Sequence, residues 1–148
     1  MFHEWEVINM LLKRTRRKTK RVLDYRVLPQ MLMELPGSKV LITRKMPGHF
    51  RDSGVVHIWV TRISHPNAVD PTNLHVVEQR VWDSISMGAK SVILDAFEYL
   101  LLENGLERTL RFVGKLRDMA LLSNSDFYVT VSDGLDERVL AMLKRIVE

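Results

Sequence analysis

Four short apolar runs constrain the fold of this chain more than any other feature of its sequence. Each is apolar almost throughout, a pattern typical of strands in a parallel sheet that is covered on both faces. The runs are KVLIT (39–43), VVHIWVT (55–61), SVILD (91–95) and DFYVTV (126–131). Helical patterns fill the later parts of the chain, at 72–87, 96–103, 106–121 and 135–147. The sequence therefore predicts a three-layer α/β domain with a parallel, or mostly parallel, four-stranded sheet.

The first quarter of the chain has a different pattern. A 4-3 spacing of side chains along one stripe predicts a helix over 4–25. The stripe consists of Ile8, Leu12, Thr15, Thr19 and Val22. A second short helix is expected over 29–35, where Pro29 suits a first turn and the helix stops at Pro36 and Gly37. We therefore expect a helical N-terminal extension, residues 1–36, followed by the α/β domain, residues 38–148.

The net charge of +4 is concentrated in this extension. Residues 1–35 hold eight Lys or Arg against four acidic residues, and KRTRRKTKR (13–21) has seven basic residues in nine. A cationic helix of this kind is typical of polyanion binding, with nucleic acid as the main example. The candidate residues are Lys13, Arg14, Arg16, Arg17, Lys18, Lys20 and Arg21.

Two other interpretations of the basic segment stay open. It could be a solvated face, or a face packed against the chain's own domain or a second subunit. It could also contact an anionic membrane surface, with Trp5, Ile8, Leu11 and Leu12 inserted below the headgroups. Threonines at the centre of the stripe make a strong coiled coil a poor expectation, since those positions favour larger apolar side chains.

The position of Asp95 raises the question of a nucleotidase. An aspartate at the end of an apolar strand is where enzymes of the RecA type bind magnesium. Such enzymes also need a GxxxxGK[ST] loop between a strand and a helix, and no glycine–lysine neighbourhood of this chain has that pattern. Instead, Asp95 and Glu98 have the spacing of a capping box, as have Asn104 and Glu107 at the next helix. We therefore expect Asp95 to cap a helix.

The carboxyl ends of the predicted strands form a polar rim, the place where ligands bind in open α/β sheets. The rim comprises Arg44, Lys45, Thr61, Arg62, Asp95, Ser132 and Asp133, of which Arg44, Arg62, Asp95 and Ser132 are the principal candidates. Its mixed charge could hold a small ligand. We expect instead internal ion pairs, such as Arg62 with Asp95, together with helix capping.

The sequence gives no indication of an enzyme. Cysteine is absent, which excludes thiolate catalysis, disulfides and sulfur-ligated metals, and no two of the five histidines have the i, i+4 spacing of a zinc protease. We therefore expect no catalytic residues, no metal and no cofactor. No apolar run is long enough to span a membrane, so we expect a cytoplasmic protein. The absence of cysteine and the scarcity of glutamine lean toward a heat-adapted source.

Several motifs resemble the archaeal family known as domain of unknown function 835. They are Trp59–Thr61, Pro71–Leu74, Glu98–Leu100 with Asn104 and Gly105, Lys115–Asp118 and Leu135–Arg138. The resemblance covers about residues 38–148. It implies an α/β domain similar to a RecA/KaiC-type core that lacks the nucleotide loop, a pseudo-ATPase in outline. It implies no established activity and no catalytic residues.

These observations together predict a non-enzymatic interaction or regulatory domain with a basic helical arm. The expected partner is another protein, or a second copy of the chain that associates through the N-terminal arm. The alternative is a nucleic-acid-binding accessory protein that uses residues 13–21.

Overall fold

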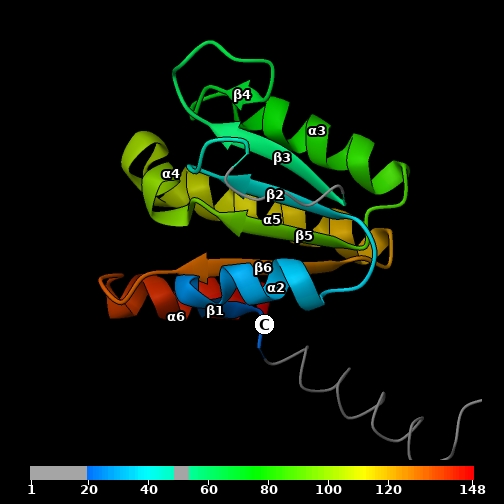
Figure 1. Cartoon of the computed structure of the whole chain (residues 1–148). Helices are drawn as coiled ribbons and strands as arrows, with labels where there is room; N and C mark the ends of the chain where they lie inside the picture. The colour runs from blue at the N-terminus through cyan, green and yellow to red at the C-terminus, as the bar shows by residue number, and fades with distance from the viewer. Residues whose placement is uncertain (1–19, 49–53) are drawn as a thin grey trace, which may run out of the picture.

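The fold is built on one parallel sheet of six strands (Figure 1). The computed structural model describes residues 20–48 and 54–148. The strands are β1 (Val22–Asp24), β2 (Lys39–Thr43), β3 (Val55–Val60), β4 (Ala68–Val69), β5 (Ser91–Asp95) and β6 (Asp126–Val131). They lie in the order β1-β6-β5-β2-β3-β4, and neighbouring strands are parallel throughout.

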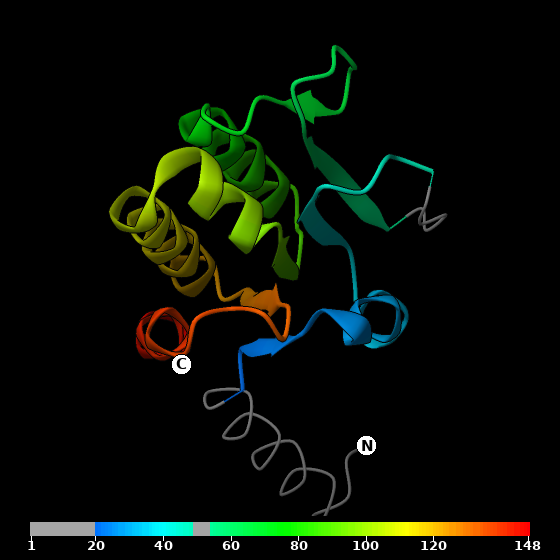
Figure 2. The ribbon, with the colours of Figure 1, turned by 90° about the vertical axis from the view of Figure 1, so that its left-hand side faces the viewer.

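Helices cover both faces of the sheet. The helical elements are η1 (Tyr25–Val27), α2 (Leu28–Glu34), α3 (Leu74–Ser86), α4 (Phe97–Asn104), α5 (Leu106–Leu122) and α6 (Glu137–Val147). Figure 2 looks toward the ends at which the strands finish and shows α2 on one side of the sheet and α3, α5 and α6 on the other. The predicted three-layer α/β class is therefore confirmed.

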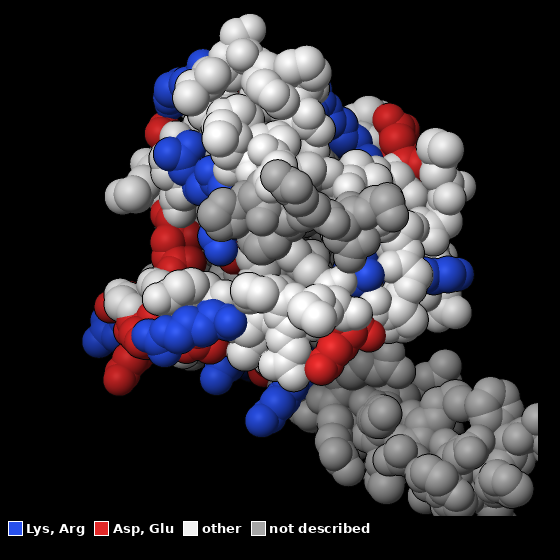
Figure 3. Space-filling model, viewed as in Figure 1, with Lys and Arg blue, Asp and Glu red and all other residues white. Residues whose placement is uncertain are grey.

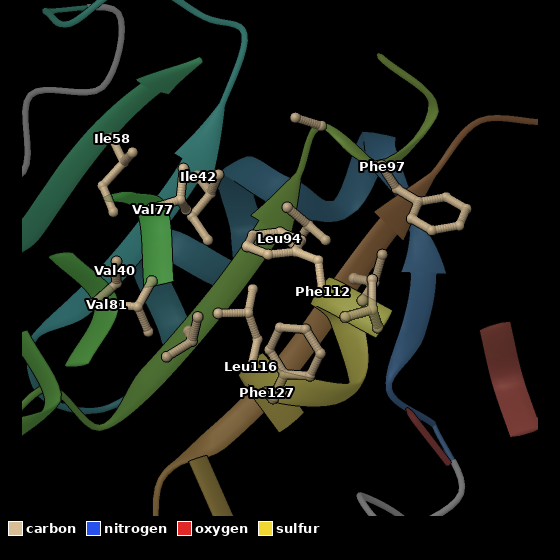
Figure 4. Close-up of a cluster of buried hydrophobic side chains, with 14 of the residues drawn as sticks. Val40, Ile42, Ile58, Val77, Val81, Leu94, Phe97, Phe112, Leu116 and Phe127 are labelled. Atoms are coloured by element: carbon tan, nitrogen blue, oxygen red, sulfur yellow. The ribbon is translucent and has the colours of Figure 1, made fainter. Parts of the chain in front are cut away.

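Alternation along the strands divides the core between the two faces. Val40, Ile42 and Leu94 point toward α3 and α5, where they meet Phe112 and Leu116 in the larger of two buried clusters (Figure 4). The intervening side chains point the other way and pack under α2 in a smaller cluster, which contains Leu28, Leu32, Leu41, Ile93 and Tyr128. Because every strand of the sheet centre is buried on both faces, the strands read in the sequence as continuous apolar runs.

The predicted strand count was wrong, because six strands form rather than four. Residues 22–24 were expected to end a helix, but Val22 and Leu23 pair with Val129 and Thr130 of β6 as the edge strand β1. The 4-3 spacing extends to Val22 in the sequence, yet pairing with a distant strand decides the local conformation there. Residues 65–71 were expected to be a loop, and β4 lies within them. A strand of two residues is too short to produce a periodic pattern.

The other predicted elements are confirmed within a few residues. The runs 39–43, 91–95 and 126–131 coincide with β2, β5 and β6, and the helix expected over 29–35 is α2. Together β1, η1 and α2 place residues 22–34 against the sheet, so this stretch of the predicted extension is packed on the α/β layers. Most of the helix expected over 4–25 lies outside the described residues. Within the described ranges, no helix is both long and apolar enough to span a membrane.

Candidate functional site

The chain changes direction across the sheet between β2 and β5. These strands are neighbours, but the chain leaves β2 for β3 on one side and leaves β5 for β6 on the other. In open α/β sheets, the connections after two such strands diverge and leave a crevice at their carboxyl ends. The candidate site of this protein lies in that crevice.

A cavity of about 330 Å³ occupies this position. Residues at and just beyond the carboxyl ends of β2, β5 and β6 line it, with one residue that follows β1. They are Tyr25, Thr43, Arg44, Lys45, Asp95, Ala96, Glu98, Tyr99, Thr130, Val131 and Ser132. Figure 3 has the same viewpoint as Figure 1. It shows basic and acidic side chains close together on the left of the molecule, the side on which β2, β5 and β6 end. Of the four principal rim candidates, the structure brings Arg44, Asp95 and Ser132 together here.

Asp95 lies between two threonines from the neighbouring strands. Thr43 of β2 is its register partner and donates from Oγ1 to Asp95 Oδ2 at 2.7 Å. Thr130 of β6 donates from Oγ1 to Asp95 Oδ1 at 2.5 Å. Both threonines are buried, with 0% and 2% of their surface exposed. Three parallel strands therefore contribute one row of hydrogen-bonded side chains to the wall of the cavity.

The prediction that Asp95 caps a helix was wrong. The N-cap of α4 is Ala96, and its side chain makes no capping hydrogen bond. Glu98 does not reach back to Asp95, because its Oε2 accepts from the backbone N–H of Ser132 at 2.7 Å. The same expectation for Asn104 was also wrong, since α5 begins after Gly105 without a side-chain cap. Capping-box spacing is a local pattern, and here partners distant in the chain hold the carboxylates of Asp95 and Glu98.

Burial raises the pKa of Asp95 above that of an ordinary aspartate, since its surroundings disfavour the charged form. The hydrogen bonds from Thr130 and Thr43 and the positive charge of Lys45 act in the opposite direction, but burial is the larger effect. A carboxyl group with a raised pKa in a crevice is a common feature of functional sites.

Arg44 is fixed at the cavity by two contacts. Its guanidinium carbon lies 3.9 Å from the centre of the Tyr99 ring, and one N–H donates to the carbonyl of Val60 at 2.8 Å. The carbonyl of Arg44 accepts from the indole N–H of Trp59 at 3.0 Å, which fixes the backbone as well. The side chain is thus positioned before any ligand arrives, although the residue is exposed.

Arg62 is not part of this site, and the predicted ion pair with Asp95 was wrong. Its guanidinium contacts Glu103 at 2.7 Å and Asp70 at 3.3 Å. Thr61 and Asp133 of the wider rim also lie outside the cavity lining, and Asp133 pairs with Arg26 at 2.5 Å. The rim therefore separates into a cavity near β5, an ion-paired surface near β4 and the Arg26–Asp133 ion pair near β1.

Only two of the predicted polyanion-binding residues lie within the described ranges. Lys20 is exposed. The guanidinium of Arg21 donates to Asp126 at 3.1 Å and lies 5.0 Å from the centre of the Tyr128 ring, and 15% of its side-chain surface is exposed. Lys13, Arg14, Arg16, Arg17 and Lys18 lie outside the described residues. Polyanion binding by 13–21 stays a prediction.

The sequence analysis missed the two threonines that hold Asp95. A signal for them exists, since Thr43 is the last residue of β2 and Thr130 the penultimate residue of β6, each following an apolar run. Relating them to Asp95 requires the register of β2 and β6 against β5, which the sequence does not give. In the described part of the chain, no group of three or more His, Cys, Asp or Glu side chains could hold a metal ion.

Comparison with known proteins places the chain in a family. A search of curated proteins finds no match. The family model described as protein of unknown function (DUF835) matches residues 17–147, starting earlier than the resemblance read from the motifs. Since this match covers most of the chain, including β1 and α2, the protein belongs to the DUF835 family.

Proposed function

We propose that this protein is a non-enzymatic regulatory domain that binds a small anion in the cavity between the ends of β2, β5 and β6. The observation that carries the proposal is the guanidinium of Arg44, which Tyr99 and Val60 hold at that cavity. The acidic groups of the cavity already accept hydrogen bonds from the protein, Asp95 from two threonines and Glu98 from the amide of Ser132. Arg44 and Lys45 line the same cavity, and the charge of Lys45 also acts on Asp95.

Arg44 is suited to receive an anion. A guanidinium has five N–H donors in a fixed plane, and the contact with Val60 uses one of them. Stacking on Tyr99 restricts the rotation of that plane. A positioned guanidinium binds carboxylate or phosphate oxygens with less loss of side-chain entropy than a flexible cation does.

The start of α4 supports the same choice of ligand. Ala96, Glu98 and Tyr99 line the cavity, so the first turn of this eight-residue helix lies at its wall. Backbone N–H groups at a helix start carry partial positive charge and favour anions. The cavity of about 330 Å³ has room for a small ligand.

The buried hydroxyl groups around Asp95 favour a regulatory role over catalysis. A hydrolytic or transfer enzyme needs a nucleophile beside a base and a group to stabilise the developing charge. The hydroxyls nearest to Asp95 belong to Thr43 and Thr130, which are buried and donate to the carboxylate itself. This arrangement supports a rigid binding wall.

The test is a titration of the full-length protein with inorganic phosphate, followed by amide NMR spectra at constant ionic strength. We expect saturable shifts at the amides of residues 44–45 and 96–99. Lys45→Gln and Arg44→Gln should weaken binding about tenfold or more, because each removes a charge-assisted contact. Arg62→Gln is the matched control, since this arginine also follows a strand but pairs with Glu103 outside the cavity. Shifts that do not saturate, or an equal loss in the control, would contradict the proposal.

Nucleic-acid binding by residues 13–21 is a second proposal, supported by seven basic residues in nine. Fluorescence anisotropy with labelled DNA and RNA tests it across a salt series. If it is right, the logarithm of the binding constant falls linearly with the logarithm of salt concentration. Changing Lys13, Arg14, Arg16 and Arg17 to Gln should remove binding. Binding that survives this change, or none at low salt, would rule the segment out.

A further inference from the structure

Asp95 imposes a condition on any anion that enters the cavity at the ends of β2, β5 and β6. The residue is partly buried and lines the cavity together with Arg44 and Lys45. An ionised carboxylate can only accept hydrogen bonds, and the same is true of a fully deprotonated anion. Two such groups repel each other unless a proton lies between them. An anion beside Asp95 must therefore bring a proton of its own, or Asp95 must carry one.

The two threonines do not exhaust the capacity of Asp95 to accept hydrogen bonds. A carboxylate has about four lone-pair sites on its two oxygens. Thr43 donates to one oxygen and Thr130 to the other. Because both threonines are buried in strands, they also fix the orientation of the carboxylate. Asp95 can therefore accept a further O–H, and a ligand in the cavity can supply it.

Glu98 adds a second acceptor to the same cavity. It belongs to α4, and its bond with the backbone N–H of Ser132 uses one of its two oxygens. The cavity thus combines two cations, Arg44 and Lys45, with two carboxylates. A ligand that satisfies both kinds of group has anionic oxygens for the cations and a hydroxyl group for a carboxylate.

We propose that Asp95 makes the cavity selective for anions that carry a hydroxyl group of their own. Hydrogen phosphate and hydroxy acids belong to this class, whereas sulfate and simple carboxylates do not. The hydroxyl group of the ligand donates to Asp95, and its anionic oxygens accept from Arg44 and Lys45. This selectivity rests on the anion site proposed above and defines the class of ligand that the site takes.

The experiment compares phosphate with sulfate by calorimetric titration of the full-length protein near neutral pH, at constant ionic strength in chloride. Sulfate resembles phosphate in size and shape and has the higher average charge, so attraction to Arg44 and Lys45 alone would favour sulfate. We expect phosphate to bind about tenfold or more tightly, because only phosphate offers an O–H to Asp95.

Lactate and propionate form a second pair, which differs by a hydroxyl group and carries a carboxylate in place of the phosphate. A preference for phosphate over sulfate alone would assign the site to phosphate. A preference for lactate over propionate alone would assign it to hydroxy acids. Either result supports selection by the hydroxyl group.

The variant that tests the role of Asp95 is Asp95→Asn, because an amide can donate to sulfate as well as accept from phosphate. We expect the affinities for phosphate and sulfate to become similar in this variant. Asp70→Asn is the matched control, since Asp70 also follows a strand and the change removes the same charge outside the cavity lining. It should keep the wild-type preference. Thermal melts establish that both variants are folded.

The pH dependence of sulfate binding gives a measurement on the unchanged protein. Burial raises the pKa of Asp95, and sulfate itself takes up no proton in mildly acidic solution. As pH falls toward that pKa, the protonated carboxyl group can donate to sulfate, so sulfate binding should strengthen. The charged and titratable groups that line the cavity with Asp95 are Arg44 and Lys45 after β2, Glu98 and Tyr99 in α4, and Tyr25 in η1. Since Glu98 is also a carboxylate, Asp95→Asn must abolish the strengthening.

Three results would overturn this selectivity while leaving the anion site in place. The first is equal binding of the two anions in both pairs. The second is a preference for phosphate that Asp95→Asn leaves unchanged. The third is sulfate binding that does not strengthen on acidification. If no anion binds saturably, the proposed function fails, and the selectivity fails with it.

Discussion

Two aspartates that occupy similar places in the sequence behave in opposite ways in the structure. Asp95 ends β5 and Asp70 follows β4, and a helix comes after each. Asp70 accepts from the amide and the hydroxyl of Thr72, at 2.9 and 2.7 Å, and from Arg62 at 3.3 Å. Asp95 accepts from threonines that are 52 and 35 residues away in the chain.

The two environments shift the pKa in opposite directions. The hydroxyl and amide of Thr72 lower the pKa of Asp70, because both stabilise the charged form. Burial raises the pKa of Asp95. The comparison teaches that an aspartate after a strand is a turn residue when its partner is local, and part of the core wall when its partners come from neighbouring strands. The latter belongs to the candidate site.

The largest effect on stability is expected from the substitution Thr130→Val. This change keeps the shape of the buried side chain and removes one donor to Asp95, so the carboxylate loses a partner that water cannot easily replace. We expect the free energy of unfolding to fall by about 1–3 kcal/mol. Urea denaturation measures it, and Thr72→Val is the comparison. If Thr72→Val lowers the free energy of unfolding as much as Thr130→Val does, then a local and a long-range partner of an aspartate contribute equally to stability.

A smaller effect is expected in the pH dependence of stability, where the two aspartates should differ in sign. The folded protein binds the Asp95 proton more tightly than the unfolded chain does, so this group stabilises the fold most at low pH. That contribution is lost as pH rises from about 4, where an unfolded aspartate titrates, through the raised pKa. For Asp70 the contribution is present above the unfolded pKa and is lost as pH falls through the lowered pKa.

The measurement is the stability of the wild type relative to Asp95→Asn and to Asp70→Asn across this acidic range. We expect the wild-type advantage to decrease with rising pH in the first comparison and to increase in the second. Slopes of the same sign would show that burial does not govern Asp95.

The smallest effect on stability is expected from the substitution Arg62→Gln. This arginine joins Asp70 to Glu103 at an exposed position, where water screens ion pairs and their net contribution is slight. We expect a melting temperature within the scatter of the wild type in physiological salt. A clear loss of stability would mean that the ion-paired surface near β4 holds the fold as firmly as the row around Asp95 does.

The helix starts separate what local sequence can predict from what it cannot. The start of α6 is capped locally, because Asp136 accepts from the amides of Arg138 and Val139. Gly105, where α4 ends, has a positive φ of 82°, a conformation that glycine adopts readily. The capping role of Asp95 failed although Asp95 and Glu98 have capping-box spacing, since Thr43 and Thr130 compete for the same oxygens.

The sequence by itself determined the α/β class, the central strands and most of the helices, because buried parallel strands and amphipathic helices leave periodic apolar patterns. It also placed Arg44, Asp95 and Ser132 at strand ends. Only the tertiary structure decided that β1 joins the sheet, that Arg62 turns away to Glu103, and that Asp95 lies between two threonines. Each of these depends on which strands are neighbours and in what register, and pairing between distant segments leaves no mark in a local pattern.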